Sequence, residues 1–362
     1  MRVFIFRLIV PALMFCICAC APVQIQTTGS SAASSASPEA AFFRAARNGN
    51  LIAVMQLVEE KIVSVHIRDN TGWNGLMYAA QNGHDGLVEY FLMKKVNIHH
   101  RDAEGLTALM IAVNYRHPDI VDDLLKAGAD PAGQDAHGYT PLMWAIYNKS
   151  RESIPYLIST GKGINLQNEQ GETALHMALY YRFSDIAAEL IQRGASVNLA
   201  DKKRQTPLHL AAAHGDAECV RLLAARGANT ASPDEGGETA LMKAIRSRHS
   251  ETASFLISRM SGFDSRDENG QTALHPAVQN DMPDVVCQLV RKKAGLNIQD
   301  HQGTTPLMIA ARWGLETIVT CLVDNGASLP LRNAFGETAR DIAESYRQRS
   351  ITEYLDQKEK MR

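Results

Sequence analysis

Residues 135–142 have the sequence DAHGYTPL, a short turn followed by the first residues of a helix. Asp135 and Gly138 are turn residues, because Gly adopts positive φ at little steric cost. Thr140 is suited to cap a helix, and Pro141 fits the first helical position, where no backbone N–H is needed. The stretch therefore predicts a tight turn that leads directly into a capped helix.

The same pattern recurs every 33 residues along the chain. Its Leu returns at each step, with Arg in its place in the last one: Leu76, Leu109, Leu142, Leu175, Leu208, Leu241, Leu274, Leu307 and Arg340. An Ala obeys the same step from Ala46 to Ala343, which gives ten units in phase. Such a period identifies a repeat protein, and we number its units so that Leu76 lies in unit 2 and Arg340 in unit 10.

Each unit also contains a second amphipathic helix. In unit 3 it is predicted at 118–125, PDIVDDLL, whose apolar residues fall at i, i+1, i+4 and i+5 on one face. Gly128 then fits a left-handed helix C-cap. One turn and two short helices cannot bury their own apolar face, so the units are expected to stack into a solenoid.

The repeat resembles that of the ankyrin repeat family. Residues 206–212, TPLHLAA, match the signature T-P-L-H-x-A, and residues 222–229, LLAARGAN, match the ending of its second helix. The resemblance covers residues 39–355. It implies an all-α solenoid of about ten helix-turn-helix units, caps included, joined by short β-hairpin-like turns. It also implies binding to another protein rather than catalysis.

Sequence motifs of several enzyme classes are missing, among them G-x-S-x-G, H-E-x-x-H and G-x-G-x-x-G. His176, His209 and His275 occupy the signature His position, where the resemblance implies bonds within the turn and to a neighbouring repeat. His66 and His99 lie one unit apart, but no carboxylate or Cys completes a metal-binding set. We therefore expect no enzyme activity, no cofactor and no metal.

The N-terminus has the features of an export signal that ends in a lipid attachment site. Arg2 and Arg7 flank the start of a short apolar segment, 8–15, which cannot span a bilayer. Residues 17–20, ICAC, resemble a bacterial lipobox, which implies cleavage before Cys20 and attachment of lipid to it. The alternative is cleavage elsewhere, which would give a soluble secreted protein.

Four segments follow from these observations. Residues 1–19 are expected to form the signal peptide, and residues 20–38 the lipidated Cys20 and a flexible tether. The tether is rich in Ser, Ala, Thr and Gln and has no apolar periodicity. The solenoid is expected at 39–355, and a charged C-terminal tail at 356–362.

Net charge and cysteine positions limit the partners further. The formal net charge is −2, so no basic field attracts nucleic acid, and we expect a monomeric solenoid without a nucleic-acid partner. Cys219 replaces a core Ile and is expected to be buried. Cys287 and Cys321 lie on adjacent second helices, whose spacing of about 8–10 Å exceeds the disulfide limit of about 7 Å. Three free thiols are therefore expected.

The resemblance implies a concave face built from hairpin tips and the ends of first helices. Large apolar side chains gather there in units 2 to 5, where we expect a partner to bind: Trp73, Leu106, Tyr115, Tyr139, Tyr147, Tyr180 and Tyr181. Tyr and Trp are enriched at binding hot spots. The alternative is that these rings pack on adjacent tips and brace the hairpins.

Two other sets near this face have plainer interpretations. Trp144, two residues after Leu142, is expected in the core. An acidic set at the tips is expected to be a solvated face: Glu169, Glu172, Asp234, Glu235, Glu238 and Glu268.

These features favour a membrane-tethered protein-interaction scaffold in the bacterial envelope, in the periplasm or at the cell surface. No Asp follows Cys20, which favours the outer membrane. An alternative is a secreted or surface-exposed effector that binds a host protein. A third is an enzyme whose site no motif reveals.

Overall fold

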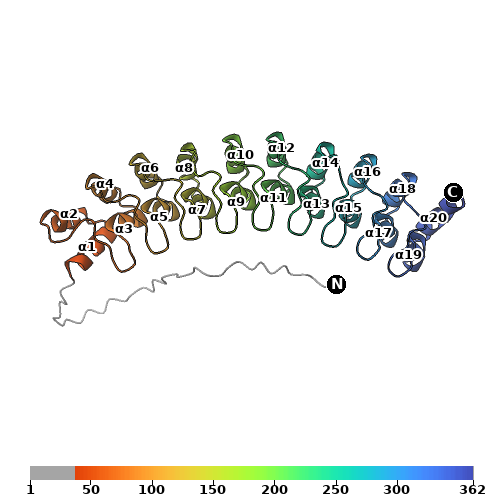
Figure 1. The fold of residues 1–362 in the computed structure, drawn as a ribbon, viewed down its shortest axis with the longest axis horizontal. Coiled ribbons are helices and arrows are strands. Elements are labelled where there is room, and N and C mark those ends of the chain that lie inside the picture. The colour runs from red at the N-terminus through yellow and green to blue at the C-terminus, as the bar shows by residue number, and fades with distance from the viewer. Residues whose placement is uncertain (1–36, 362) are drawn as a thin grey trace. The chain divides into compact units, whose positions relative to one another are not determined.

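The structure, a computed structural model, describes residues 37–361 as a row of stacked helix pairs. Figure 1 shows the pairs along an arch, with one helix of each pair on the convex edge and the hairpin loops on the concave side. The described residues form twenty α-helices and no strand, and a single isolated antiparallel bridge joins Arg68 and Asn74. The all-α repeat solenoid predicted from the sequence is confirmed.

The first helix of each unit lies in the inner row. These helices are α1 (Pro38–Arg47), α3 (Gly75–Asn82), α5 (Ala108–Asn114), α7 (Pro141–Tyr147), α9 (Ala174–Tyr180), α11 (Pro207–His214), α13 (Ala240–Arg246), α15 (Leu274–Gln279), α17 (Pro306–Trp313) and α19 (Ala339–Ser345). The second helices form the outer row: α2 (Leu51–Glu59), α4 (Asp85–Met93), α6 (Pro118–Lys126), α8 (Ile154–Ser159), α10 (Ser184–Gln192), α12 (Ala217–Ala225), α14 (Ser250–Arg259), α16 (Pro283–Arg291), α18 (Glu316–Asp324) and α20 (Arg349–Met361).

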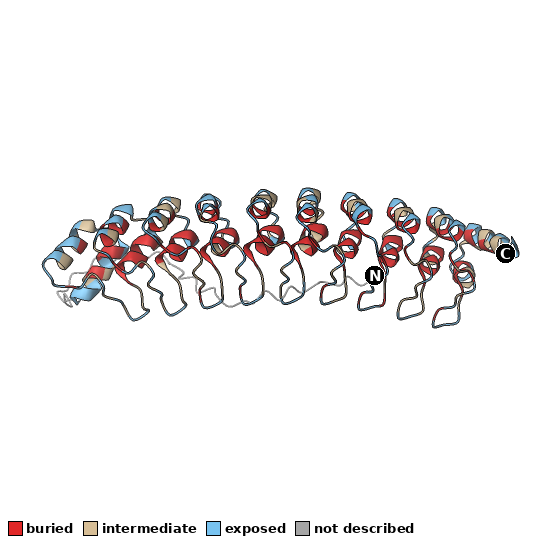
Figure 2. Cartoon of the chain, turned by 45° about the horizontal axis from the view of Figure 1, so that its top comes forward, coloured by how far each residue is buried: buried red, intermediate tan, exposed pale blue. Residues whose placement is uncertain are grey.

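The inner row packs through the alanines that recur every 33 residues. Each of them is 0% exposed: Ala46, Ala79, Ala112, Ala145, Ala178, Ala211, Ala244, Ala277, Ala310 and Ala343. Because Ala projects only a methyl group, neighbouring inner helices can approach closely. Figure 2 shows the buried residues concentrated between the two rows, with exposed residues along the outer helices and the loops.

The hairpin tips are joined to one another by backbone hydrogen bonds. The amide of Ala136 in unit 4 donates to the carbonyl oxygen of Glu104 in unit 3 at 2.9 Å, and one such bond recurs at every later junction. At Gly138 an added Cβ would lie 2.9 Å from the Cα of Asn168 in the next unit. The close approach of the tips therefore explains the Gly at this position.

Three units hold a neutral His in the first turn of the inner helix. Nδ1 of His176 accepts the amide hydrogen of Thr173 at 3.2 Å, so Nε2 carries the ring hydrogen and donates to the carbonyl of Gln205 in the next unit at 3.1 Å. His209 and His275 make the equivalent bonds. The two bonds expected for these residues are confirmed, and burial lowers the pKa of all three imidazoles.

These histidines make the stability of the solenoid depend on pH. Their pKa in the folded chain lies below the ordinary value of 6.5. Below about pH 6.5 the unfolded chain takes up protons that the folded chain does not, so the free energy of unfolding falls as the pH falls. Other units have Met at this position, as Met143 and Met242 show.

The triple variant His176→Met, His209→Met and His275→Met provides the test. We expect its melting temperature to drop less than that of the wild type between about pH 7.5 and about pH 5. The remaining histidines are common to both proteins and serve as the internal control. Equal drops in the two proteins would contradict this account.

A pair of cysteines contradicts the expectation of three free thiols. Cys287 in α16 and Cys321 in α18 form a disulfide, with their Cα atoms 6.2 Å apart. The expected separation was the distance between helix axes, but residues that face each other across two packed helices lie closer together than the axes. Cys219 is buried and free as expected, and burial raises the pKa of its thiol.

The two ends of the chain complete the comparison with the expected segments. The predicted signal peptide and almost all of the predicted tether lie outside the described residues, and α1 begins at Pro38. At the other end α20 continues through Met361, and Lys358 on it lies 2.7 Å from Asp324 on α18. The described part of 356–362 is therefore the end of the last helix rather than a separate tail.

Candidate functional site

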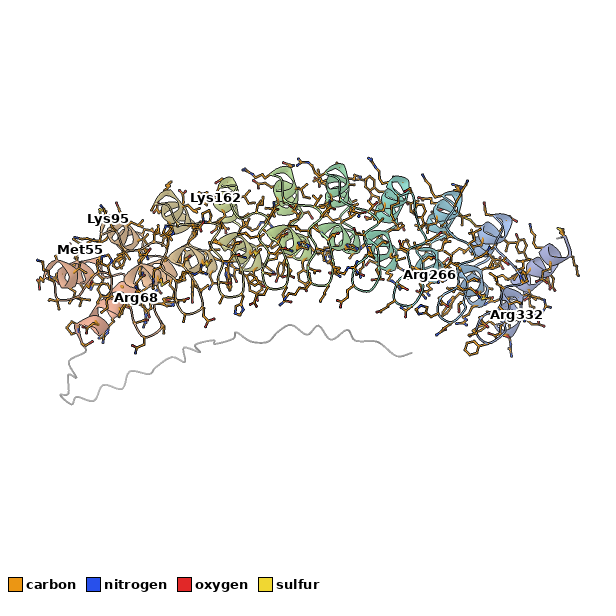
Figure 3. All side chains as sticks on the ribbon, viewed as in Figure 1. Met55, Arg68, Lys95, Lys162, Arg266 and Arg332 are labelled. Atoms are coloured by element: carbon orange, nitrogen blue, oxygen red, sulfur yellow. A yellow bond between two sulfur atoms is a disulfide. The ribbon has the colours of Figure 1, made fainter. Side chains whose placement is uncertain are left out.

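The seven residues predicted to bind a partner lie in the hairpin loops and at the ends of inner helices, but they differ in exposure. The side chains of Tyr115, Tyr147 and Tyr180 are 47%, 49% and 50% exposed. The other four are partly buried against the hydrophobic core: Trp73, Leu106, Tyr139 and Tyr181. Figure 3 shows how densely side chains line the loop side, where Arg266 and Arg332 lie, as well as the outer row, where Lys95 and Lys162 lie.

Four of the seven come together in units 4 and 5. The ring centroids of Tyr139 and Tyr147 lie 6.5 Å apart, and those of Tyr147 and Tyr181 lie 6.1 Å apart. Tyr180 is 5.2 Å from Tyr181. Trp144 completes the group, 5.6 Å from Tyr139 and 5.9 Å from Tyr147. We call these five residues the concave aromatic cluster.

Trp144 is not a core residue, contrary to the prediction. Its indole is only partly buried, and Nε1 donates to Oδ2 of Asp135 at 2.8 Å. Helix α7 carries Trp144 three residues before Tyr147, and residues at this spacing lie on the same face of a helix. This spacing was the signal in the sequence that could have assigned Trp144 to the cluster.

The bond from Trp144 closes the hairpin of its own unit. Oδ1 of Asp135 accepts the backbone amides of His137 and Tyr139 at 2.9 and 2.8 Å. These bonds leave Oδ2 free for a side-chain donor, which Trp144 supplies. The recurring turn Asp thus binds backbone with one oxygen and a side chain with the other.

Two other units place a different donor at the position of Trp144. In unit 2 the hydroxyl of Tyr78 donates to Oδ2 of Asp69 at 2.5 Å. In unit 7 the ammonium of Lys243 lies 2.8 Å from Oδ2 of Asp234. The position therefore has a structural role in each of the three units, whichever donor fills it.

Trp73 belongs to a separate group of contacts. Its ring lies 5.1 Å from that of Tyr78, and its Nε1 donates to Oδ2 of Asp102 in the next unit at 2.9 Å. Among residues 37–361 no ring contact links Trp73 to the concave aromatic cluster. The bracing alternative therefore explains Trp73.

The remaining two predicted residues also lie apart from the cluster. Leu106 is partly buried and packs against the hydrophobic core. The hydroxyl of Tyr115 accepts a hydrogen bond from Nε2 of Gln81 at 2.8 Å, which ties unit 3 to unit 2. Of the two, Tyr115 alone keeps a large exposed surface.

Part of the acidic set is not a solvated face. Asp234 and Glu238 both pair with Lys243, and Arg246 pairs with Glu238 and with Asp267 of the next unit. Burial raises the pKa of Asp234, but the hydrogen bond from Lys243, the backbone hydrogen bond from Glu238 and the positive charge of Lys243 together outweigh it, so that pKa is lowered. In unit 7 the carboxylates of Asp234 and Glu238 are therefore paired with basic residues of the same unit.

Glu172 beside the concave aromatic cluster is different. Its carboxylate accepts a hydrogen bond from Nδ2 of Asn168 at 2.8 Å, and within the described part of the chain no Arg or Lys pairs with it. Burial first, then the neighbouring tyrosines and Glu172, raise the pKa of Tyr181 to about 12. Burial and Glu172 also raise the pKa of Tyr139. The surroundings of these rings therefore disfavour negative charge.

Metal-binding groups and membrane-spanning helices are both absent from residues 37–361. No group of three or more His, Cys, Asp or Glu side chains in 37–361 is placed to hold a metal ion. In the same span no helix combines the length and the apolar character needed to cross a bilayer.

The side chains of the cluster are expected to differ in what they contribute to stability. Replacing Trp144 with Ala removes a packed ring and leaves Oδ2 of Asp135 without its donor, so the free energy of unfolding should fall by about 2–4 kcal/mol. Replacing the half-exposed Tyr147 or Tyr180 with Ala should cost less than about 1 kcal/mol. Denaturant unfolding measures all three. A loss for Tyr180→Ala as large as that for Trp144→Ala would assign Tyr180 to bracing.

Comparison with known proteins agrees with the repeat pattern. The family model described as ankyrin repeats (3 copies) matches overlapping segments at residues 23–102, 42–135, 76–168, 142–234, 196–267, 228–300, 257–333 and 274–360. No curated protein matches the chain. Among solved structures, the ankyrin repeat domain of Bcl-3, described as a unique member of the IkappaB protein family, is similar with 28% identity and a TM-score of 0.51. The match covers 60% of this chain and 99% of that one.

Sequence period, buried alanines, capped inner helices and linked hairpin tips all agree with this match. Ankyrin repeat domains bind protein partners, and the fold is typically a scaffold for interaction rather than an enzyme. The family model covers the chain almost without a gap from residue 23 to residue 360. The chain belongs to the ankyrin repeat family.

Proposed function

We propose that the mature chain is a lipid-anchored scaffold in the bacterial envelope that holds a protein partner against its concave face. The concave aromatic cluster carries the proposed binding site, because Tyr147 and Tyr180 are large aromatic side chains that keep about half of their surface exposed. Tyr and Trp give a large contact area at a low entropic cost and are enriched at hot spots. The centre of the interface is therefore placed at units 4 and 5.

The surroundings of the cluster resemble the layout of protein interfaces, which have an apolar centre and a polar rim. Beside Tyr147, the amide of Asn148 donates to the exposed Asn114 of unit 3 at 2.8 Å. Glu172, whose negative charge acts on Tyr139 and Tyr181, is half-buried. A partner that covers the rings would meet these hydrogen-bonding groups.

The anchoring part of the proposal rests on the sequence around Cys20, which lies outside the described residues. A tether of residues 21–38 would have an r.m.s. reach of about 23–25 Å, enough to let the solenoid turn relative to a membrane. The disulfide between Cys287 and Cys321 supports export, because disulfides persist mainly in oxidising compartments such as the periplasm.

Binding at the cluster is tested by capture of the partner from envelope extract. The double variant Tyr147→Ala and Tyr180→Ala should lose the partner retained by the wild type, with nearly the same melting temperature. Trp313→Ala is the matched control, because Trp313 is 65% exposed but lies in unit 9. Retention of the partner by the Tyr variant, or its loss with Trp313→Ala, would place the interface elsewhere.

The anchor is tested by metabolic labelling with an alkyne fatty acid. The wild type should incorporate the label and sediment with membranes, whereas Cys20→Ser should do neither, because the thiol that accepts the lipid is missing. Protease treatment of intact cells then separates a periplasmic from a surface-exposed protein. Recovery of unlabelled wild-type protein in the medium would favour the secreted effector instead.

A further inference from the structure

We infer that the concave aromatic cluster together with Glu172 binds a positively charged side chain, Arg or Lys, on a basic segment of the partner. The inference rests on the proposed function, because it names the chemistry of the partner at the same site. It is carried by three observations on residues 37–361: the half-exposed rings with no cation over them, the carboxylate of Glu172 with no basic side chain as its partner, and the contrast with unit 7.

The rings of the cluster lack the cations that cover other aromatic rings of the chain. The guanidinium of Arg47 lies 4.7 Å from the ring centre of Tyr78, and the ammonium of Lys94 lies 5.6 Å from that of Tyr90. Phe255, Tyr346 and Tyr354 are covered in the same way. None of the five rings of the cluster has an Arg or Lys over it within residues 37–361.

Within the described residues, the ring of Phe183, at the border of the cluster, is covered by a cation, whereas its neighbour Tyr181 is not. Phe183 lies 6.4 Å from Tyr181, and the guanidinium of Arg151 covers it at 5.3 Å. The next ring along, Tyr181, has no such cover within the described chain. A cation over an aromatic ring contributes about 0.5–2 kcal/mol, more when water is excluded, and the half-exposed rings of Tyr147 and Tyr180 can receive one from a partner.

Glu172 supplies the opposite charge. It is the residue before the capping Thr173, the position that Tyr139 holds in unit 4. Its carboxylate accepts the hydrogen bond from Asn168 at 2.8 Å, and its negative charge adds to burial in raising the pKa of Tyr139 and, to a smaller extent, that of Tyr181. A carboxylate beside tyrosine rings stabilises a cation in two ways, by direct ion pairing and by the ring quadrupole.

In unit 7 the chain itself supplies the pairing of cation and carboxylate that we infer between a partner and units 4 and 5. Lys243 and Arg246 take the positions of Trp144 and Tyr147, 99 residues later. Both basic side chains pair with Glu238, which takes the position of Glu172 two units on. Where the chain provides its own cations the carboxylate is satisfied, whereas units 4 and 5 present rings and a carboxylate without them.

The competing occupant is an acidic segment. Lys202, Lys203 and Arg204 at the hairpin tip of unit 6 would attract it, and Arg182 lies on the turn after α9. The guanidinium of Arg182 already donates to the carbonyl oxygen of His214 at 3.2 Å. The carboxylate of Glu172, which has the neutral Asn168 amide and no basic side chain of residues 37–361 as its partner, favours the cation, so the acidic segment is kept as an outcome of the test.

The test uses three labelled peptides of equal length on the full mature chain: alternating Arg and Ser, the same with citrulline for Arg, and the same with Glu for Arg. Fluorescence anisotropy measures binding of each peptide. We expect saturable binding of the Arg peptide and no binding of the other two. Glu172→Gln keeps the acceptor for Asn168 but removes the charge, and should weaken binding about fivefold. Glu235→Gln removes the same charge at the tip of unit 7 and should change affinity by less than about twofold.

Two double variants separate the contribution of the aromatic rings to peptide binding from that of side-chain size. The pair Tyr147→Leu and Tyr180→Leu should weaken binding of the Arg peptide by about fivefold or more, whereas Tyr147→Phe with Tyr180→Phe keeps the ring faces and should bind nearly as the wild type does. Equal effects of Glu172→Gln and Glu235→Gln, equal binding of the citrulline peptide, or preference for the Glu peptide would overturn the inference. So would the absence of binding up to about 1 mM peptide.

The outcome is distinguishable from failure of the proposed function. If the captured partner is lost with Tyr147→Ala and Tyr180→Ala but is retained by Glu172→Gln, and the Arg peptide does not bind, the interface stands and its proposed chemistry fails. If capture is unaffected by the Tyr variant, the interface itself is elsewhere.

Discussion

Close packing of one unit on the next is the constraint on which the rest of the structure depends. No unit can bury its apolar face alone, and the alanines of the inner row, all fully buried, set how near neighbouring helices come. From unit 3 onward the tips are fixed at the same spacing by one backbone bond per junction, such as that between Ala136 and Glu104. Any larger residue at the Ala positions would separate the inner helices and strain the tips together.

Because the packing is regular, residues 33 apart line up along the concave face, and their identities alone give each unit its chemistry. The position that closes each hairpin shows this freedom. Tyr78, Trp144 and Lys243 all donate to the turn Asp of their own units, yet the first two add aromatic surface and the third adds charge. The hairpin and the proposed recognition site therefore share a side chain, because Trp144 bonds to Asp135 and also packs within the concave aromatic cluster.

The exposure of an aromatic side chain separates those that brace the fold from those proposed to bind a partner. Trp73 has its indole hydrogen bonded across to Asp102 and its ring packed on Tyr78, so its size is explained by the fold. Within residues 37–361 no such hydrogen bond accounts for the exposed halves of Tyr147 and Tyr180. Units 7 and 5 differ in whether the fold explains their charged residues. In unit 7, Lys243 and Arg246 both pair with Glu238. In unit 5, no basic residue of the described chain pairs with Glu172.

The sequence by itself determined the period, the ten units, the capped inner helices and the buried alanines, since each follows from local turn chemistry and helical periodicity. It also placed Tyr139, Tyr147, Tyr180 and Tyr181 near one another. Only the tertiary structure decided the disulfide between Cys287 and Cys321, the exposure of Trp144 and the ion pairs of Asp234 and Glu238. These depend on distances and directions between side chains of adjacent helices, which a repeat period fixes only to the nearest unit and not to the few ångströms that a bond requires.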